Sequence, residues 1–473
     1  MKFTTLRRGA VDMTSGPILK QLLVFGAPIF LGSVFQQLYS MVDSIVVGNY
    51  VGTDALASVG SASLIAGCLV MAATGLTMGA SVVIAQLAGA KQFGRIRHAV
   101  STTMIFAFFV ALGVTAAGLA FAPHMIRWVR VPEALRADSV AYLRIYVGGT
   151  LFLMFYNFFS AMLRALGDST TPLVFLIIAS LLNIALDLWF VLSFRMGVAG
   201  VALATVLAQG ISVLLCAVHC ARKVEAFRFR KGEFRFHREL FRDILRLSVP
   251  SALQFSLANL GFVLVQGLIN SFGEVSMAAY TAASKLEGVA HLPIESISMS
   301  LSVFVGQNIG AGGMPRVKTG LRRTLLFSAA VCALIGLLVY TLGPQLIALF
   351  VDDQDKNAAE VIVTGAAFMR VWAPLTAVFA VMNCFSSVLR GAGDSLFCMA
   401  ASFADLGGRT VMAYVLALGF RIGFMGIAYA MFCGWVLSLI ISLFRYASGG
   451  WKRKAVSGTG LPPSEENAGS SPV

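Results

Sequence analysis

The chain has 473 residues, of which 58% are hydrophobic and only 12% are charged, and it carries a formal net charge of +14. Average soluble domains contain roughly 45–50% apolar and about 25% charged residues, so this composition excludes an ordinary soluble domain. The basic excess forms no separate basic domain, which leaves little support for nucleic-acid binding.

Long apolar runs predict membrane-spanning helices. Runs such as 104–122, 173–194 and 325–342 approach the roughly 20 residues that cross a bilayer as a helix. A transmembrane β-barrel is excluded because its strands would alternate in polarity, which these runs do not. We predict an all-α integral membrane protein with twelve transmembrane helices, near residues 18–48, 54–85, 96–121, 137–161, 170–194, 198–221, 241–271, 276–306, 321–343, 359–388, 394–419 and 424–447.

The sequence is internally duplicated. The heptapeptide Leu-Arg-Ala-Leu-Gly-Asp-Ser at 163–169 returns as Leu-Arg-Gly-Ala-Gly-Asp-Ser at 389–395, which is 226 positions later. Gln-Leu-Ala-Gly-Ala at 86–90 likewise returns as Gln-Asn-Ile-Gly-Ala at 307–311, 221 positions later. A period this long is unlike those of solenoid or propeller repeats. It predicts two fused halves of like fold, each with six helices.

The even number of helices determines how the halves are related. Six helices return the chain to its starting side, so the halves are expected to be parallel repeats. Most Lys and Arg residues then fall on one side, which predicts cytoplasmic N- and C-termini in the plasma (inner) membrane. Residues 1–17 are polar, so no cleaved signal peptide is expected. The predicted organisation is a cytoplasmic N-terminus (1–17), an N-lobe (18–221), a basic cytoplasmic linker (222–240), a C-lobe (241–447) and a disordered cytoplasmic tail (448–473).

Two carboxylates lie within predicted spans of the first half. Asp43 falls in the first span and Asp187 in the fifth, and Asn183 shares a helix face with Asp187 because they are four residues apart. An ionisable group at mid-bilayer costs at least about 2.5–3.5 kcal/mol, so we expect a functional reason for each. Asn157 and Thr205 add neutral oxygens, and such oxygens suit a hard cation such as Na⁺, or a proton. The alternative is structural, with Asp43 capping a helix end and Asp187 pairing with a backbone donor.

The second half carries a different polar set. Lys285 and Glu287 lie in the eighth span, and Asp405 and Arg409 lie four residues apart in the eleventh. One interpretation is a structural network of ion pairs, Asp405 with Arg409 and Lys285 with Glu287. The other is a polar patch in the C-lobe that faces the substrate. Exchanging Asp405 and Arg409 separates the two, because restored expression with lost transport favours the substrate-facing patch.

Prolines and glycines mark the remaining features of the helices. Pro28 and Pro250 interrupt the first helix of each half, where a missing hydrogen bond allows a bend. Their role is either packing or helix movement. In the doubled heptapeptide, glycine permits a turn and Asp168 or Asp394 can cap the following helix. We interpret these turns as structural.

In their order and spacing, these features resemble the multidrug and toxic compound extrusion (MATE) family. The resemblance covers roughly residues 14–447 and rests on Pro28, Val-Asp-Ser at 42–44, Gln-Leu-Ala-Gly-Ala-Lys-Gln at 86–92, the doubled heptapeptide, and Asn183 with Asp187. It implies a V-shaped, two-lobe antiporter that expels organic cations in exchange for Na⁺ or H⁺. It also implies a set of cation-coupling ligands and two polar neighbours: Asp43, Asn183, Asp187 and Thr205, with Tyr39 and Asn157 beside them.

The chain departs from part of that family. Some members carry a second cation site in the C-lobe, with a Glu in helix 7 and an Asp in helix 10, and those positions align near Ala258 and Phe379 here. A C-lobe Na⁺ site is therefore not expected.

The mechanism that we expect is alternating access. An amphipathic cationic drug enters from the inside, and a proton or Na⁺ from the outside then neutralises Asp43 and Asp187. This weakens their hold on the drug and bends the first helix near Pro28. No cofactor beyond the coupling ion is expected, and nothing demands a partner chain, so a monomer is expected.

Three other functions are weaker fits. A lipid-linked sugar flippase shares the helix count and the superfamily resemblance, but it needs basic residues for pyrophosphate, for which only Arg409 and Lys285 are candidates. An enzyme is not expected, since the zinc motif HExxH and the nucleophile motif GxSxG do not occur. A channel or receptor suits this repeat geometry less well than an alternating-access carrier does.

Overall fold

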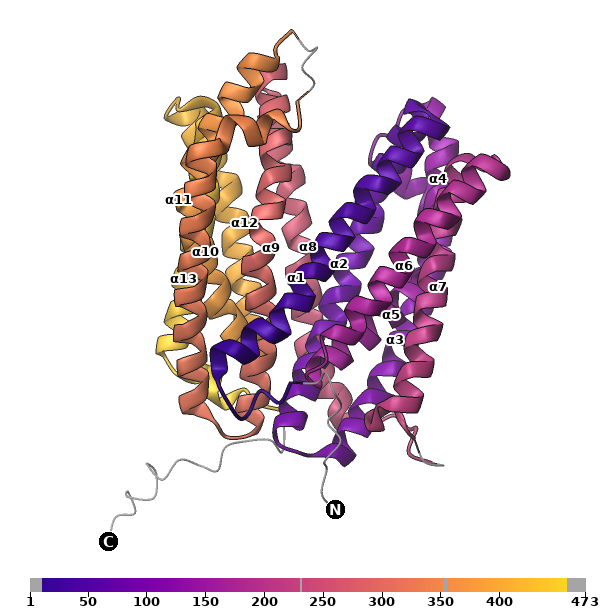
Figure 1. The fold of residues 1–473 in the computed structure, drawn as a ribbon, viewed down its shortest axis with the longest axis vertical. Helices are drawn as coiled ribbons and strands as arrows, with labels where there is room; N and C mark the ends of the chain where they lie inside the picture. Colours follow the sequence, from indigo (N-terminus) through magenta and orange to yellow (C-terminus); the bar gives the residue numbers. More distant parts are fainter. Residues whose placement is uncertain (1–10, 230–231, 352–355, 457–473) are drawn as a thin grey trace. The chain divides into compact units, whose positions relative to one another are not determined.

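The computed structural model describes residues 11–229, 232–351 and 356–456. Within these residues the chain is helical and contains no β-strand (Figure 1). Helices are what the apolar runs require, because in lipid a helix satisfies its backbone N–H and C=O groups within one segment. The predicted all-α fold is confirmed.

Nine helices of the described chain are long and apolar enough to cross a membrane, and one bent pair adds a tenth. Two further helices, α8 (Arg238–Asn270) and α12 (Ser395–Tyr414), are outside that set. In α12, Asp405 and Arg409 lower the hydropathy of an otherwise apolar segment. The predicted count of twelve crossings therefore stays a prediction.

The bent pair consists of α4 (Glu133–Gly148) and α5 (Thr150–Ala165), which meet at an angle of 48°. Gly149 lies at the break. A Cβ atom on Gly149 would overlap the side chain of Val206 on α7, so glycine lets the two segments approach α7 closely. Paired glycines are a common cause of sharp helix bends. The sequence predicts one span at 137–161 here, and the structure divides it into two helices.

The helices fall into two compact units. Among the described residues, the first unit contains Val11, Phe25–Ser81 and Gly94–Ser256. Its central helix is α7, against which α4, α5 and α6 pack. Its elements are α1 (Ile18–Val46) from Phe25 onward, η1 (Val47–Val51), α2 (Thr53–Gly89) as far as Ser81, α3 (Phe93–Trp128) from Gly94 onward, α4, α5, α6 (Thr170–Leu188), η2 (Trp189–Ser193), α7 (Gly197–Lys223), η3 (Glu225–Phe227) and the start of α8.

The second unit contains the described parts of Asp12–Val24, Val82–Phe93 and Leu257–Val473. Its central helix is α11 (Ala358–Gly391), which packs against α9, α10 and α13 around a core that includes Phe368, Trp372 and Trp435. The other elements after α8 are α9 (Glu274–Gly310), α10 (Met314–Ala348), α12, η4 (Val415–Gly419), η5 (Gly423–Met425), α13 (Gly426–Ala447) and η6 (Gly450–Arg453).

The backbone repeats where the sequence does. Arg195 (φ 52°) and Arg421 (φ 56°) share the left-handed conformation and are 226 positions apart (421 − 195). The π-helical turns η2 and η4 begin at Trp189 and Val415, which are also 226 positions apart (415 − 189). Residues other than glycine rarely adopt a positive φ, so two arginines with this conformation at duplicated positions indicate that the backbone follows the same path in both halves. The repeat is therefore a property of the fold as well as of the sequence.

The two copies of the doubled heptapeptide form the same turn. The Asp168 N–H donates to the Leu163 carbonyl and the Asp394 N–H donates to the Leu389 carbonyl, at 2.9 Å in each case. In the first copy, the Asp168 carboxylate also accepts hydrogen bonds from the backbone N–H groups of the next helix, at 3.1 Å from Thr170 and 2.9 Å from Thr171. The predicted capping role is confirmed for Asp168.

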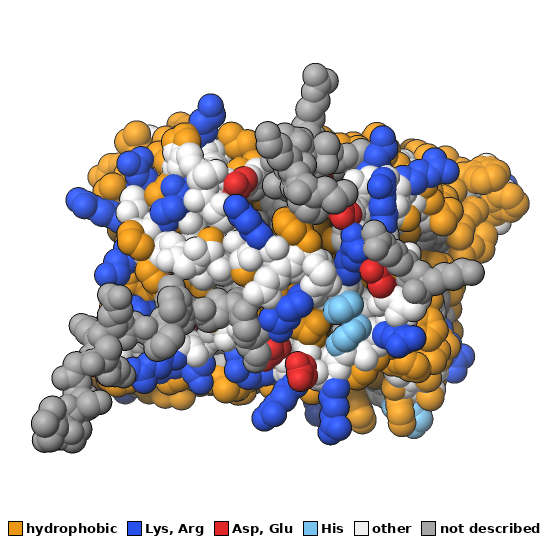
Figure 2. Space-filling view, turned by 90° about the horizontal axis from the view of Figure 1, so that it is seen from below, with side chains coloured by type: hydrophobic (Ala, Val, Ile, Leu, Met, Phe, Trp, Pro, Cys, Tyr) orange, Lys and Arg blue, Asp and Glu red, His pale blue; other side chains and the backbone are white. Residues whose placement is uncertain are grey.

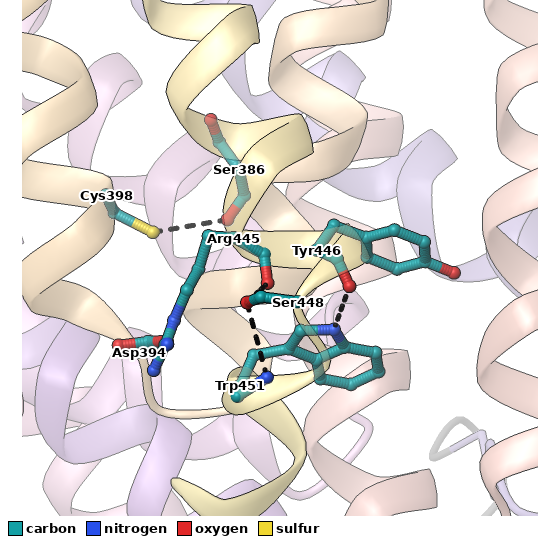
Figure 3. A network of polar contacts seen from close by, with 8 residues as sticks. Ser386, Asp394, Cys398, Arg445, Tyr446, Ser448 and Trp451 are labelled. Atoms are coloured by element: carbon teal, nitrogen blue, oxygen red, sulfur yellow. Dashed lines mark hydrogen bonds and ion pairs between the residues drawn. The ribbon is translucent and has the colours of Figure 1, made fainter.

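Asp394 has a different role, so the predicted capping role is wrong for the second copy. Its side chain makes no capping hydrogen bond. Instead, Arg445 Nε on α13 donates to Asp394 Oδ2 at 2.5 Å (Figure 3). The Asp394 residue is only 3% exposed. The guanidinium is a charged donor and a stronger partner for a carboxylate than a neutral backbone N–H. The position 226 residues before Arg445 is His219.

We expect Asp394→Asn to destabilise the second unit clearly. The substitution leaves the Arg445 guanidinium in a buried site without its counter-ion, and breaking a buried ion pair in this way costs about 3–5 kcal/mol. The apparent Tm of the purified protein in detergent measures the loss. The matched control is Asp168→Asn at the duplicated position, which should change Tm little because Asn caps a helix about as well as Asp. Equal Tm values for the two variants would refute the conclusion that the Asp394–Arg445 ion pair stabilises the second unit.

The two duplicated glutamines hold the two ends of the described chain. Gln307 Oε1 accepts from the backbone N–H of Met13 at 3.2 Å, and Gln86 Oε1 accepts from that of Val456 at 2.7 Å. The Gln86 amide also donates to the Gly391 carbonyl at 2.9 Å. All of these residues belong to the second unit.

A backbone crossing lies beside these glutamines. A Cβ atom on Gly89 would overlap the carbonyl oxygen of Gln307, and one on Gly310 would overlap that of Gln86. The ends of α2 and α9 therefore pack backbone to backbone, which only glycine allows.

The predicted disorder of the tail (448–473) does not extend to its first residues. Gly450–Arg453 form η6, and the Trp451 indole N–H donates to the Tyr446 carbonyl at 3.0 Å (Figure 3). The Trp451 ring also stacks on that of Tyr446, with 5.4 Å between centroids. The Trp451 side chain is buried, and this burial holds η6 against the second unit. Residues 457–473 of the predicted tail and 1–10 of the predicted N-terminus lie outside the described residues.

Candidate cation-binding site

Two carboxyl groups meet inside the first unit. Asp43 lies on α1, and Asp187 lies on α6 with none of its surface exposed. The two groups are within hydrogen-bonding reach of each other. Asp43 Oδ1 and Asp187 Oδ1 are buried and have no hydrogen-bond partner among the described residues. The structural alternative for these residues, a helix cap and a backbone donor, does not account for these two oxygens.

The side-chain amide of Asn183 connects Asp187 to Thr205. We orient it so that its N–H donates to Asp187 Oδ2 at 3.2 Å and its oxygen accepts from the Thr205 backbone N–H at 3.1 Å. In the opposite orientation its N–H would donate to Thr205 Oγ1 at 3.4 Å. The first orientation is preferred because both the Asn183 amide oxygen and the Asp187 carboxylate then have a hydrogen-bond donor. The predicted i, i+4 pairing of Asn183 with Asp187 on one helix face is thus present.

Tyr39 and Asn157 occupy different surroundings. The Tyr39 hydroxyl is within hydrogen-bonding reach of Thr205, and Tyr39 is close enough to Asp43 for their charges to interact. The Asn157 Oδ1 instead accepts from Thr74 Oγ1 on α2 at 3.3 Å, and its Nδ2 donates to the Leu153 carbonyl at 3.0 Å. Tyr39 therefore joins the cluster of Asp43, Asn183, Asp187 and Thr205, whereas Asn157 has its contacts with α2 and with its own helix.

Two tyrosines of α4 are additional members that the sequence did not reveal. Tyr142 is 5% exposed and close enough to Asp43 for their charges to interact. Tyr146 stacks on Tyr142, with 6.1 Å between ring centroids. Their i, i+4 spacing was the available signal. It was inconspicuous, because aromatic residues are common in membrane helices.

Both carboxylates lie just before a widened helical turn. The π-helical turns η1 and η2 begin four residues after Asp43 and two residues after Asp187. Such turns often occur at functional sites. However, η4 repeats η2 in the second unit, where Ala413 stands 226 positions after Asp187. The widened turn therefore belongs to the duplicated scaffold, and the carboxylates distinguish the first copy.

This cluster has the chemistry of a site for a small cation. Two carboxylates in contact repel each other when both are ionised, so they favour binding a proton or a cation between them. Carboxylate, amide and hydroxyl oxygens are ligands for a hard cation. Pro28, the predicted bending point of α1, lies inside that helix, as Pro250 does inside α8.

The predicted C-lobe residues divide into three groups. Arg409 donates to Asp405 Oδ2 at 3.2 Å, which confirms that pair. Lys285 is exposed, with its ammonium 5.7 Å from the centroid of the Phe350 ring. Glu287 is 5% exposed and is close to Arg409. The structure therefore does not show the predicted Lys285–Glu287 pair, because residues two apart on a helix do not face each other.

Comparison with known proteins identifies the family. The MatE family model matches residues 28–189 and 250–415, one match in each half of the duplicated sequence. The chain belongs to the MatE family. It is therefore a multi-pass membrane protein of a transporter family, as the resemblance implied.

Relatives of this MatE protein match nearly the whole chain. The Bacillus subtilis protein described as "Probable multidrug resistance protein YpnP" is 29% identical over 94% of this chain and 98% of its own length. The Thermotoga maritima protein described as "Probable multidrug resistance protein NorM" is 24% identical over 93% of this chain and 94% of its own.

Solved structures share its fold. An outward-facing MATE family transporter superposes with a TM-score of 0.86 at 21% identity, covering 94% of this chain and 99% of that one. A structure described as MATE in the bent conformation gives a TM-score of 0.84 at 21% identity, covering 94% of this chain and 98% of that one.

Proposed function

We propose that this MatE protein is a secondary antiporter that exports amphipathic, mostly cationic drugs or toxic metabolites in exchange for H⁺ or Na⁺. The observation that carries the proposal is the buried pair of carboxyl groups at Asp43 and Asp187, with unpartnered oxygens and with Asn183 and Thr205 beside them. The relatives named for multidrug resistance support drugs as the exported substrate.

The coupling ion acts on the charge of this cluster. A proton or Na⁺ that enters from the outside and is shared by Asp43 and Asp187 cancels one of their two negative charges and thereby relieves the repulsion between them. This favours a different arrangement of α1, which can bend where Pro28 leaves a backbone carbonyl without its hydrogen bond. Coupling follows if ion and drug stabilise different conformations, since a ligand with equal affinity for both shifts nothing.

The distribution of basic residues supports a plasma-membrane protein with both termini in the cytoplasm. Lys and Arg side chains are frequent on the face at the lower ends of the helices (Figure 2). Cytoplasmic loops of membrane proteins carry such an excess.

A lipid-linked sugar flippase gains no support from the cationic residues of the second unit. Arg409 is paired with Asp405, and Lys285 lies over the Phe350 ring. Pyrophosphate binding would instead require basic groups free to face an anion.

Transport in proteoliposomes under separate gradients tests the proposal. The purified protein is reconstituted, and ethidium movement is followed with either a Na⁺ gradient or a pH gradient imposed. We expect one of the two gradients to drive ethidium transport and protein-free liposomes to show none. Ethidium transport at the same rate with and without each gradient would exclude ion-coupled antiport.

A further inference from the structure

The basic linker between the duplicated halves is fastened to α3. Its carbonyl at Arg235 accepts from Ser101 Oγ at 2.9 Å, and the His237 N–H donates to Thr102 Oγ1 at 3.1 Å. The His237 ring also stacks on that of His98, with 4.0 Å between centroids. These contacts join the linker to one side of α3, just before α8 begins.

Two ion pairs add to this attachment. Arg97 on α3 contacts Glu225 at 2.9 Å and Glu233 at 3.4 Å. Both glutamates belong to the linker, so its own acidic side chains are engaged with α3. The described linker residues all lie within the first unit. The linker therefore holds a defined position on that unit.

The fastened linker presents an aromatic side chain that the fold leaves exposed. Phe236 is 47% exposed, although its ring lies 4.8 Å from that of Phe241 on α8. The Phe241 ring in turn lies 5.4 Å from that of Phe106 on α3. Phe109 is three residues further along α3, on the same helix face, and is 65% exposed. These four phenylalanines form an aromatic strip where the linker, α3 and α8 meet.

Exposed arginines border the aromatic strip. Arg238 and Arg242 are one turn apart on α8, and Arg235 precedes them in the linker. None of the three forms an ion pair with a described residue. Phe241 lies three residues after Arg238, so the arginines and the strip occupy adjoining faces of α8.

The acidic residues of this part of α8 do not neutralise the arginines. Glu239 and Asp243 each follow an arginine by one position, which turns them about 100° around the helix. Asp243 is also 7% exposed. The four arginines within 235–246 outnumber these two carboxylates. The surface therefore keeps a positive charge.

The exposed face of α8 changes from basic to apolar along the helix. Arg238, Arg242 and Arg246 share a face with Val249 and Leu253, since each is three or four positions from the next. All five are exposed, Val249 by 42% and Leu253 by 47%. This order is typical of a helix that passes from lipid headgroups into the hydrocarbon of a bilayer. It indicates that the arginines lie at the level of the lipid phosphates.

A ligand that fits this surface combines an anionic group with an apolar body. Arginine presents a planar fork of N–H donors that matches the oxygens of a phosphate. A soluble phosphate would leave the aromatic strip uncovered. A zwitterionic headgroup would bring its own ammonium group close to the arginines. A phospholipid with a net negative charge satisfies both parts of the surface.

We propose that the linker, α3 and α8 form a binding site for an anionic phospholipid at the edge of the first unit. Arg235, Arg238 and Arg242 bind the headgroup phosphate, and Phe236 and Phe109 contact the acyl chains. Because the linker supplies contacts to both parts of the lipid, a bound lipid strengthens its attachment to α3. The site uses none of the residues of the candidate cation site, so the inference does not depend on the proposed antiport.

Native mass spectrometry of the purified full-length protein in detergent tests the site. Phosphatidylglycerol or phosphatidylcholine with the same acyl chains is added in increasing amounts, and the lipid-bound fraction gives an apparent Kd. We expect phosphatidylglycerol to bind at least about tenfold more tightly, since each basic residue near an anionic lipid contributes about fivefold. The double variant Arg238→Gln/Arg242→Gln should weaken phosphatidylglycerol binding about 10- to 30-fold and change phosphatidylcholine binding less than about twofold.

The double variant Arg322→Gln/Arg323→Gln is the matched control. It removes the same charge from two exposed arginines of α10 in the second unit. Its Kd for phosphatidylglycerol should stay within about twofold of the wild-type value.

Phe236→Ala examines the apolar part of the site without changing any charge. It should weaken the binding of both lipids about threefold to tenfold, because a half-exposed ring gains part of the free energy of burial when acyl chains cover it. If Arg238→Gln/Arg242→Gln does not give a monodisperse protein, Phe236→Ala and the preference of the wild type for phosphatidylglycerol decide.

Four results would overturn the site. They are equal Kd values of the wild type for the two lipids, an equal loss of phosphatidylglycerol binding in the two double variants, unchanged binding of both lipids in Phe236→Ala, and displacement of the lipid by glycerol phosphate. The last result would show a site for a soluble anion. Ethidium transport takes no part in these measurements, so a failure here leaves the proposed antiport untouched.

Discussion

Asp43→Asn should reduce ethidium efflux from intact cells to the level of cells with empty vector. Asparagine has nearly the shape of aspartate but neither ionises nor takes up a proton, so the pair with Asp187 loses its exchangeable charge. Coupling free energies between sites are typically about 1–3 kcal/mol, or about 5- to 150-fold in ligand affinity, and a transporter that loses this coupling can no longer use the ion gradient to export the drug. Efflux is measured at matched amounts of protein in the membrane.

Asp54→Asn provides the control for this experiment. Asp54 lies in the first turn of α2 and is exposed, so the same substitution there should leave efflux unchanged. Asp187→Asn should behave as Asp43→Asn does, because either change leaves a single carboxylate. Efflux at the wild-type rate in Asp43→Asn would rule out the cation site described above.

Gly89→Ala and Gly310→Ala should each cause a large loss of stability. At both positions the added methyl group would overlap a backbone carbonyl oxygen, of Gln307 in one case and of Gln86 in the other. A carbonyl within a helix cannot rotate away as a flexible side chain can, so the crossing helices must separate. Overpacking costs about 1–3 kcal/mol and occasionally more, and we expect the upper part of this range. The apparent Tm and the yield of monodisperse protein in detergent both report the effect.

Gly113→Ala is the control for the crossing. Gly113 is also inside a helix, α3, but apart from the neighbouring backbone of α3 itself no atom lies within 4 Å of the position of an added Cβ. Alanine is favoured over glycine in a helix interior by about 1 kcal/mol, so this variant should be as stable as the wild type or slightly more so. A Gly89→Ala variant with the same Tm as Gly113→Ala would show that the helix ends do not cross as closely as described.

The helical segments could be predicted from the sequence because a membrane span leaves a direct signal, a long run without charges. The break at Gly149 could not be predicted, because it lies inside such a run and depends on the approach of Val206 from a later helix. The role of Asp394 could not be predicted either, because it too depends on a contact with a distant part of the chain. Its local sequence matches that of Asp168, yet its partner, Arg445, lies 51 residues later on another helix.

The candidate cation site was predictable for a different reason. Asp43 and Asp187 are conspicuous because carboxylates are costly within apolar spans, and the family resemblance placed Asn183 and Thr205 beside them. Tyr142 was missed, since a tyrosine in a membrane helix has many common explanations. The separation of Glu287 from Lys285 follows from their spacing, since residues two apart on a helix do not face each other. The proximity of Glu287 to Arg409 was not predictable, because it depends on how α9 and α12 pack.

The hydrogen bonds of the duplicated glutamines to Met13 and Val456 set the extent of the folding unit. Both glutamines are buried, so a shortened chain that lacks either terminal segment leaves a buried side-chain oxygen without that donor. The family match extends only from residue 28 to 415, and a gene fragment cut at those limits would lose both segments. Expression plasmids for this protein should therefore retain at least residues 12–456 and attach affinity tags beyond them.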